Sequence, residues 1–355
     1  MSKNKSTNVP CDILFDIFTW LPVKSLLRFQ SVSTSWNDII SGNEFKKAVL
    51  DRSKALGRVK FLSQADGDEV KISHLEYLSV ITQKQEFPLK GFGGADILCS
   101  HDGLIVLKRD GDYKKFVLWN PSTRQCQELA LVNELYHEYE IPLASRSYVE
   151  EYENPRACGL CYDSTTDDYK VILIYNLFYV VWSNANRWTR KTTLPMLEQI
   201  LPTIEQETIL CSYAYPQGVT VKGCVYWSLD EKLHSCLSRH SSIIYFDVES
   251  DELKVLPTPD FIGEKELFRL TNLKDRLSLY GGRPGSYTGE VIELDIWTMD
   301  QDGWKWSMKL RHIPEYGTFT IICFDVKTDE VKEFPTPEFV GDENHDMLAI
   351  LSIIN

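Results

Sequence analysis

Three sequence patterns could carry chemistry if the fold brought the right partners to them. Cys158 and Cys161 form a Cys-x-x-Cys pair, the spacing that zinc ribbons and redox motifs use. Residues 280–289, "YGGRPGSYTG", are rich in glycine, as phosphate-binding loops are. Seven histidines offer general bases or metal ligands. Each pattern lacks a feature that its chemistry requires, so we predict no catalytic residue, no cofactor and no metal site.

The missing features are specific. No second cysteine pair stands at zinc-ribbon spacing, and "CGLCYD" has the character of a strand, in which Cys158 and Cys161 would point to opposite faces. The glycine-rich stretch has no Lys-Ser/Thr ending and no helix after it. The histidines are dispersed, and no Gly-x-Ser-x-Gly elbow occurs. We interpret the cysteines as a buried strand pair and the glycines as a hairpin tip.

Composition is that of a globular protein. The chain has 355 residues, of which 43% are hydrophobic and 25% charged. No apolar run approaches the ~20 residues that span a bilayer, and the first two lysines have no apolar segment behind them. Nine scattered cysteines, an odd number, suit reduced thiols. We expect an intracellular protein of the cytoplasm, the nucleus or both, with no membrane contact.

Charge is unevenly placed along the chain. The net charge is −13, but residues 1–50 hold six basic and four acidic side chains, so the remainder carries −15. Such an acidic region would repel phosphates, so we expect no nucleic-acid partner. It would suit a basic protein partner, or it serves only to keep the chain soluble.

The first 50 residues have helical periodicity. Pro10 stands near a helix start, and Ile13, Ile17 and Leu21 follow at i, i+4 and i+8. Pro22 would end that helix and open the next, since proline is tolerated at a first helical position.

Two further helices are expected before about residue 50. Ser33 is a candidate N-cap for a helix that carries Trp36, and Gly42 would stop it. Asn43 could cap a short fourth helix. The apolar residues of this unit exceed what a few short helices can hide. They either pack on the rest of the chain or bind another protein.

After residue 56 the apolar period changes to two, which indicates strands. Asp-Gly pairs, which favour hairpins, stand at the following positions: 66–67, 102–103, 110–111 and 302–303. The stretch 133–155 is acidic and tyrosine-rich, and it is either a solvated loop or a loop that contacts a partner. A second acidic stretch, 329–346, is interpreted as solvated surface.

A repeat indicates the architecture of this region. Residues 243–263 return as 321–341 with 13 of 21 positions identical, and looser copies occur at 116–131 and 179–195. Repeated hairpins without helices favour a β-propeller over a single sandwich. The number of blades cannot be counted from the irregular spacing. The 321–341 unit lacks a strand before it, so the last blade is incomplete, closed by N-terminal strands, or altered.

Residues 9–45, "VPCDILFDIFTWLPVKSLLRFQSVSTSWNDIISGNEF", resemble the F-box in its plant form. The family implies a three-helix unit that docks on the Skp adaptor of a cullin–RING ubiquitin ligase. Val9 stands where leucine is usual and Cys11 where a polar residue is commoner. The resemblance implies that these residues face the adaptor: Pro10, Ile13, Ile17, Leu21, Pro22, Leu26, Val32 and Trp36. On the same basis, Leu27 and Phe29 would fill the unit's own core or face the β region.

The β region resembles the plant F-box-associated interaction domain, described as kelch-like. The resemblance lies in these segments: "CSHDGLIVL" (99–107), "LWNPSTRQ" (118–125), "CGLCYDSTTDDYKVI" (158–172), "VKGCVYWSL" (221–229), "IIYFDVESDEL" (243–253) and "IELDIWTMDQDGWKWSMK" (292–309). The expected fold class is therefore α+β. A small N-terminal three-helix F-box at 1–50 would precede a mainly antiparallel β-propeller-like domain at 51–355.

The resemblance implies a non-catalytic substrate receptor of an SCF-type cullin–RING ubiquitin ligase. The F-box would bind the Skp adaptor and the β domain an unidentified target protein. Two alternatives share the fold: an F-box scaffold outside any ligase, and an S-locus-type receptor for a basic ribonuclease. A third, a glycan-active propeller enzyme, lacks the necessary clusters of carboxylates and histidines.

Overall fold

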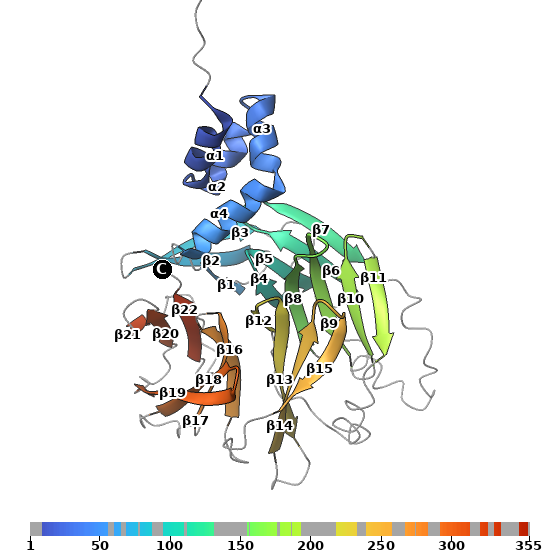
Figure 1. Cartoon of the computed structure of the whole chain (residues 1–355), viewed down its shortest axis with the longest axis vertical. Coiled ribbons are helices and arrows are strands. Elements are labelled where there is room, and N and C mark those ends of the chain that lie inside the picture. Colours follow the sequence, from blue (N-terminus) through green and yellow to red (C-terminus); the bar gives the residue numbers. More distant parts are fainter. Residues whose placement is uncertain are drawn as a thin grey trace, which may run out of the picture.

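The structure is a computed structural model. It describes the residues in these ranges: 9–55, 60–64, 69–76, 79–86, 95–109, 112–130, 155, 157–175, 178–185, 187–192, 218–232, 239–257, 267–273, 275–282, 292–312, 320–325, 330–334 and 348–353. Within them the chain forms an N-terminal group of helices followed by antiparallel sheets arranged around a common axis (Figure 1). The α+β prediction is confirmed.

The first three helices begin, and the third ends, where the sequence signals predicted, whereas the fourth is longer than expected. Pro10 precedes the first helix and Pro22 separates it from the second. Ser33 caps the third, because its hydroxyl accepts a hydrogen bond from the Trp36 backbone N–H at 3.2 Å. Gly42 ends that helix. The helices are α1 (Cys11–Thr19), α2 (Val23–Phe29), α3 (Thr34–Ser41) and α4 (Asn43–Ala55).

The helical unit has a small aromatic core. Phe18 and Phe45 are almost fully buried together with Leu26 and Ile40. The ring of Trp36 packs against Phe18 with the centroids 4.9 Å apart. α4 continues past residue 50 to Ala55, so the expected boundary between the two regions falls inside a helix.

Six sheets follow, and the strands occur in chain order within all but the last. The first three sheets contain β1 (Lys60–Gln64), β2 (Glu69–Glu76) and β3 (Ser79–Glu86); β4 (Asp96–His101), β5 (Leu104–Arg109), β6 (Asp112–Asn120) and β7 (Gln125–Ala130); and β8 (Ala157–Asp163), β9 (Asp168–Ile174), β10 (Phe178–Ser183) and β11 (Arg187–Thr192). The other three contain β12 (Val219–Val221), β13 (Cys224–Lys232), β14 (Arg239–Asp247) and β15 (Glu252–Leu256); β16 (Leu267–Leu273), β17 (Arg276–Gly282), β18 (Ile292–Asp300) and β19 (Gly303–His312); and β20 (Thr320–Asp325), β21 (Glu330–Phe334) and β22 (Leu348–Ile353).

The first strands of successive sheets lie side by side, as the inner strands of propeller blades do. β4 contacts β8, β8 contacts β12 and β13, β12 contacts β16, and β16 contacts β22. Each four-stranded sheet then steps outward as an antiparallel meander. The sheets therefore serve as blades, and the predicted propeller-like architecture is confirmed (Figure 1).

The tight turns explain the hairpins. Asp102 and Gly103 link β4 to β5 with φ angles of 52° and 79°, so both central residues of this two-residue turn are left-handed. Gly303, at φ 107°, follows the turn between β18 and β19. The Asp-Gly predictions at 102–103 and 302–303 are thus confirmed, whereas 66–67 and 110–111 lie outside the described residues.

The sequence repeat corresponds to one hairpin used twice in the same register. In the first copy Asp247 pairs with Glu252, and in the second Asp325 pairs with Glu330, 78 residues later in each strand. The looser copies form β6–β7 and β10–β11. The repeated unit is therefore the outer hairpin of a blade.

The last blade is completed in a way that the sequence left open. β22 pairs with β20 in parallel, so the final sheet has the order β21–β20–β22. In the other blades a strand precedes the repeated hairpin, but in this blade the corresponding strand, β22, follows the hairpin in the chain. β22 lies next to β16. Of the three outcomes that the sequence allowed for the last blade (incomplete, closed by N-terminal strands, or altered), the structure shows an altered blade.

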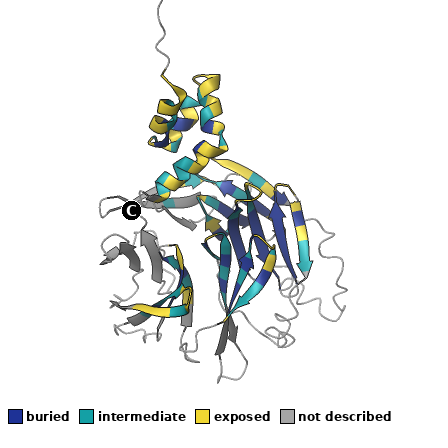
Figure 2. Cartoon of the chain, viewed as in Figure 1, coloured by how far each residue is buried: buried dark blue, intermediate teal, exposed yellow. Residues whose placement is uncertain are grey.

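The core lies between the blades (Figure 2). Cys158 belongs to the cluster between the blades of β4–β7 and β8–β11, and Cys161 to the cluster between β8–β11 and β12–β15. The two cysteines thus occupy opposite faces of a buried strand, as predicted. Between them, a Cβ on Gly159 would lie 2.5 Å from the Trp227 ring, so only glycine lets the neighbouring indole approach.

Candidate functional site

The most distinctive surface is an apolar stripe on α1. Ile13 and Ile17, one helical turn apart, expose 50% and 49% of their surface. Val9 extends the stripe before the helix and Trp20 extends it at the C-cap. The opposite side of α1 carries Phe18, which is buried in the helical core.

Exposed apolar side chains are concentrated in this part of the chain. Among the described residues, the large hydrophobic side chains with high exposure are Val9, Ile13, Ile17, Trp20, Leu27, Val32 and Trp306. All but Trp306 lie within the first 32 residues. Since contiguous apolar surface marks interaction sites, we treat the helical unit as the candidate partner surface.

The structure divides the expected adaptor-facing residues into two groups. Ile13, Ile17 and Val32 are exposed, as are Pro10 and Pro22. Leu21 and Trp36 are half-buried and pack against the helical core, so each presents only part of its side chain to a partner.

Leu26 requires a correction, because it is only 4% exposed and belongs to the core that Phe18 and Phe45 form. Its neighbour Leu27, expected inside the unit or against the β region, is 40% exposed. Phe29 packs against the helical core, which is one of the two places expected for it. Leu26 and Leu27 are therefore interchanged relative to the prediction, and Leu27 rather than Leu26 is available to a partner.

Trp20 was missed as a surface residue. It stands three residues after Ile17, so helical spacing alone would have added it to the stripe. The guanidinium of Arg52 lies 3.7 Å from the centroid of its ring. Arg52 also donates to the Thr19 hydroxyl at 2.8 Å, so α4 holds the end of α1.

α4 attaches the helical unit to two neighbouring blades. Lys54 Nζ lies 2.6 Å from Asp102 Oδ1, and the Asp102 carboxylate is largely buried in the turn after β4. Asn43 Nδ2 donates to Asp167 Oδ2 at 2.7 Å, in the turn after β8. One contact comes from each end of α4, so the helix spans the two blades.

The charges around the Lys54 contact are specific. His101 Nε2 lies 3.4 Å from Asp102 Oδ2. Burial lowers the pKa of His101, and the charge of Lys54 lowers it further, against the opposing effect of Asp102. His101 is therefore neutral at pH 7, and Lys54 is the cation that balances Asp102.

The strand order assigns the turns to the two ends of the propeller. In an antiparallel meander, the turns after the first and third strands of a blade share one end. The turns at 102–103 and 164–167, which contact α4, are first-to-second turns. The links between successive blades therefore start and finish at the end away from α4 (Figure 1). The stretch 133–155 belongs to such a link, between β7 and β8, but except for Pro155 it lies outside the described residues.

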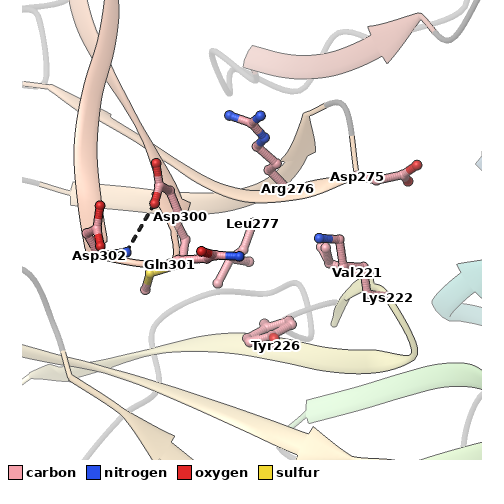
Figure 3. Close-up of a pocket in the computed structure, with 10 residues that line it drawn as sticks. Val221, Lys222, Tyr226, Asp275, Arg276, Leu277, Asp300, Gln301 and Asp302 are labelled. Atoms are coloured by element: carbon pink, nitrogen blue, oxygen red, sulfur yellow. Dashed lines mark hydrogen bonds between the residues drawn. The ribbon is translucent and has the colours of Figure 1, made fainter.

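A cavity of about 620 Å³ lies where turns of two blades meet. Lys222 and Tyr226 line it from one blade and Arg276 from the other (Figure 3). Across from them are Asp300 and Asp302, and the ammonium of Lys305 lies 2.9 and 3.1 Å from their carboxylates. The arrangement offers mixed charge to a polar ligand, and it lacks the nucleophile–base geometry that would indicate a reaction.

Two features of the described residues bear on their chemistry. In the part of the chain that the structure describes, no three His, Cys, Asp or Glu side chains gather as they would around a metal ion. No described helix is long and apolar enough to cross a membrane.

Comparison with known proteins identifies both regions. Residues 7–48 match the F-box domain, and residues 53–319 match the F-box associated beta propeller domain. The chain belongs to the F-box associated β-propeller family. The F-box match covers the helical unit with the apolar stripe, and the propeller match covers most of the β region.

Curated relatives of this F-box chain come from Arabidopsis thaliana. The F-box/kelch-repeat protein At3g23880 is 26% identical over 88% of this chain and 81% of its own length. The F-box protein At4g19940 is 25% identical over 87% of this chain and 73% of its own. A solved structure that it resembles is the β-propeller domain of Nup133 from Vanderwaltozyma polyspora, with 6% identity, a TM-score of 0.38, and coverage of 74% of this chain and 75% of that one.

Proposed function

We propose that this F-box protein is a substrate-receptor subunit of an SCF-type cullin–RING ubiquitin ligase. Its F-box would bind a Skp-type adaptor, and its propeller would hold a target protein. The observation that carries the proposal is the apolar stripe of Ile13 and Ile17, exposed on the helical unit that matches the F-box domain. Such surface is costly in water and stable only against a partner.

The proposed role needs no bond chemistry in this chain. A receptor accelerates ubiquitin transfer by holding target lysines near the loaded enzyme, which raises their effective concentration. The two α4 contacts support this role, because they connect the F-box to the blades without a flexible linker between Asn43 and Lys54. Adaptor and target would then keep a defined separation.

A pull-down with a purified Skp-type adaptor tests the adaptor half of the proposal. Ile13→Asp and Ile17→Asp place charge in the stripe but leave the core residue Phe18 in place. Burial of the exposed half of an isoleucine contributes about 0.8–1.5 kcal/mol, and an aspartate in its place also has to be desolvated, so each variant is expected to bind at least about 10-fold more weakly. Trp306→Asp, an exposed apolar residue of β19, is the matched control.

Unchanged adaptor binding by Ile17→Asp would refute the assignment of the interface. Substitutions at Leu26 or Trp36 are less informative, because these side chains belong to the helical core and their loss would unfold it. A scaffold role outside a ligase makes a different prediction for the target. Target turnover would then continue when the cullin is inhibited, whereas a ligase subunit requires it to stop.

A further inference from the structure

Two buried cysteines from neighbouring blades lie in direct contact. Cys99 stands on β4 and Cys158 on β8, the inner strands of their sheets. Their sulfur atoms are 3.0 Å apart, and both side chains are almost completely inaccessible to solvent. This distance is about 1 Å longer than the roughly 2.05 Å of a disulfide bond.

The pair lies beneath the attachment of α4. Cys99 precedes Asp102, the partner of Lys54, by three residues. Cys158 is on the strand that leads into the turn of Asp167, the partner of Asn43. A covalent link at this point would therefore join the two blades that α4 spans.

The other described cysteines are placed differently. Cys11 and Cys126 are exposed, Cys224 is half-buried, and Cys161 is buried on the opposite face of β8. Burial raises the pKa of the Cys99 thiol, and the hydrogen bond with Cys158 raises it further. The Cys99 thiol is therefore held in its protonated form, and it shares a hydrogen bond with the sulfur of Cys158.

We propose that Cys99 and Cys158 form a redox modification site, at which a hydroperoxide converts the dithiol to a disulfide between two blades. One thiol loses its proton and attacks a peroxide oxygen, the O–O bond breaks, and water leaves a sulfenic acid behind. The second sulfur attacks the first, the S–S bond forms, the S–O bond breaks, and a second water leaves. Two thiols and one hydrogen peroxide thus give one disulfide and two waters.

Burial determines which oxidant the site accepts. Hydrogen peroxide is about the size of two water molecules and needs only a small local opening between β4 and β8. Glutathione disulfide is far larger and would reach the sulfurs only after the blades separate. Because both sulfurs are buried and the Cys99 thiol is held protonated, the reaction is expected to be slower than oxidation of the exposed Cys126.

The test treats the purified full-length chain with hydrogen peroxide, with glutathione disulfide, or with dithiothreitol, and then blocks free thiols in denaturant. Peptide mapping is expected to find a Cys99–Cys158 cross-link after peroxide and not after the other two. Cys161→Ala, on the same strand, should still form it, whereas Cys158→Ala should not. The link closes a loop of about 60 residues, so the oxidised chain should melt higher by roughly 5 °C, reversibly with dithiothreitol.

Oxidation of Cys126 shows in the same digest that the oxidant was active. If Cys99 and Cys158 are both still recovered as free thiols from folded protein long after Cys126 is fully oxidised, the proposal is wrong. It is also wrong if each cysteine is oxidised singly, or if glutathione disulfide gives the cross-link as fast as peroxide does, because the selectivity would then not come from burial.

Discussion

The F-box and the propeller place their apolar residues in opposite ways. In α1, only Phe18 and Thr19 are buried, and the residues on either side of them face solvent or lie at the edge of the core. In β10, every residue from Phe178 to Ser183 is buried. A blade has a neighbour on each face and can bury both, whereas four short helices cover one another on one side only. The exposed apolar surface of the F-box is thus a consequence of its small size, whereas the stacked sheets of the propeller bury most of theirs.

The sharpest test of this contrast compares two adjacent residues of α1. Phe18→Ala removes a ring from the helical core and is expected to cost about 3–5 kcal/mol of stability. Ile17→Ala removes half-exposed surface and should change stability by about 0.5 kcal/mol or less. Hydrogen exchange of the α1 amides, measured in the full chain at increasing urea concentration, gives the stability change of each variant. Equal costs would show that the stripe is part of the core.

In the propeller, the expected weak point is a charged cluster between blades. Lys170, almost fully buried, lies 2.9 Å from Asp163, 2.7 Å from Asp251 and 3.0 Å from the Val248 carbonyl. Lys170→Ala leaves the buried Asp163 without its cation and should cost about 3 kcal/mol in urea unfolding. Lys254→Ala, which removes a partly exposed ion pair with Asp247, is the control and should cost less.

The same cluster predicts a pH dependence. Burial raises the pKa of Asp163, but hydrogen bonds from Lys170 and Thr165 outweigh it and hold that pKa well below its usual value. The resulting stability is complete above the unfolded pKa, about 4, and is lost as the pH falls below it. Unfolding free energies measured from pH 5 to pH 2 should therefore fall less steeply in Lys170→Ala. An identical slope would contradict the assignment.

A third test concerns the packing of the blades. Gly159→Ala would place a Cβ 2.5 Å from the Trp227 ring, whose Nε1 donates to the Cys158 carbonyl at 3.0 Å. This overpacking is expected to cost about 1–3 kcal/mol. Combination with Trp227→Phe should give a smaller loss than the sum of the single changes, because the smaller ring leaves room. Additive losses in thermal unfolding would indicate that the two residues do not compete for space.

The smallest effect is expected where the two regions meet. Lys54 is partly exposed, so the coupling between Lys54→Ala and Asp102→Ala should be about 1 kcal/mol or less in a double-mutant cycle. The coupling free energy is best measured by hydrogen exchange of the α4 amides, because global unfolding also reports on the many interactions that do not involve α4. No coupling at low salt would mean that Asn43 alone holds the helix.

The sequence predicted features that depend on local chemistry. Pro22, Ser33 and Gly42 marked helix ends, and the repeat at 243–263 and 321–341 marked the outer hairpins. The phase of α2 was not predictable, because a seven-residue helix with adjacent leucines fits either orientation. The contacts of α4 and the parallel pairing of β22 join residues distant in the chain, and no local pattern encodes them.

The two contacts of α4 have a geometric consequence. Asn43 and Lys54 are eleven residues apart, which along a helix is about 17 Å. Because the two contacts hold opposite ends of α4, they oppose tilting of the helix more than rotation about the line that joins them. If the F-box moves relative to the propeller, the favoured motion is rotation about the line between the Asn43 and Lys54 contacts. In the proposed ligase, a lysine on a protein held by the propeller would then move along an arc relative to the adaptor bound by the F-box, rather than in all directions.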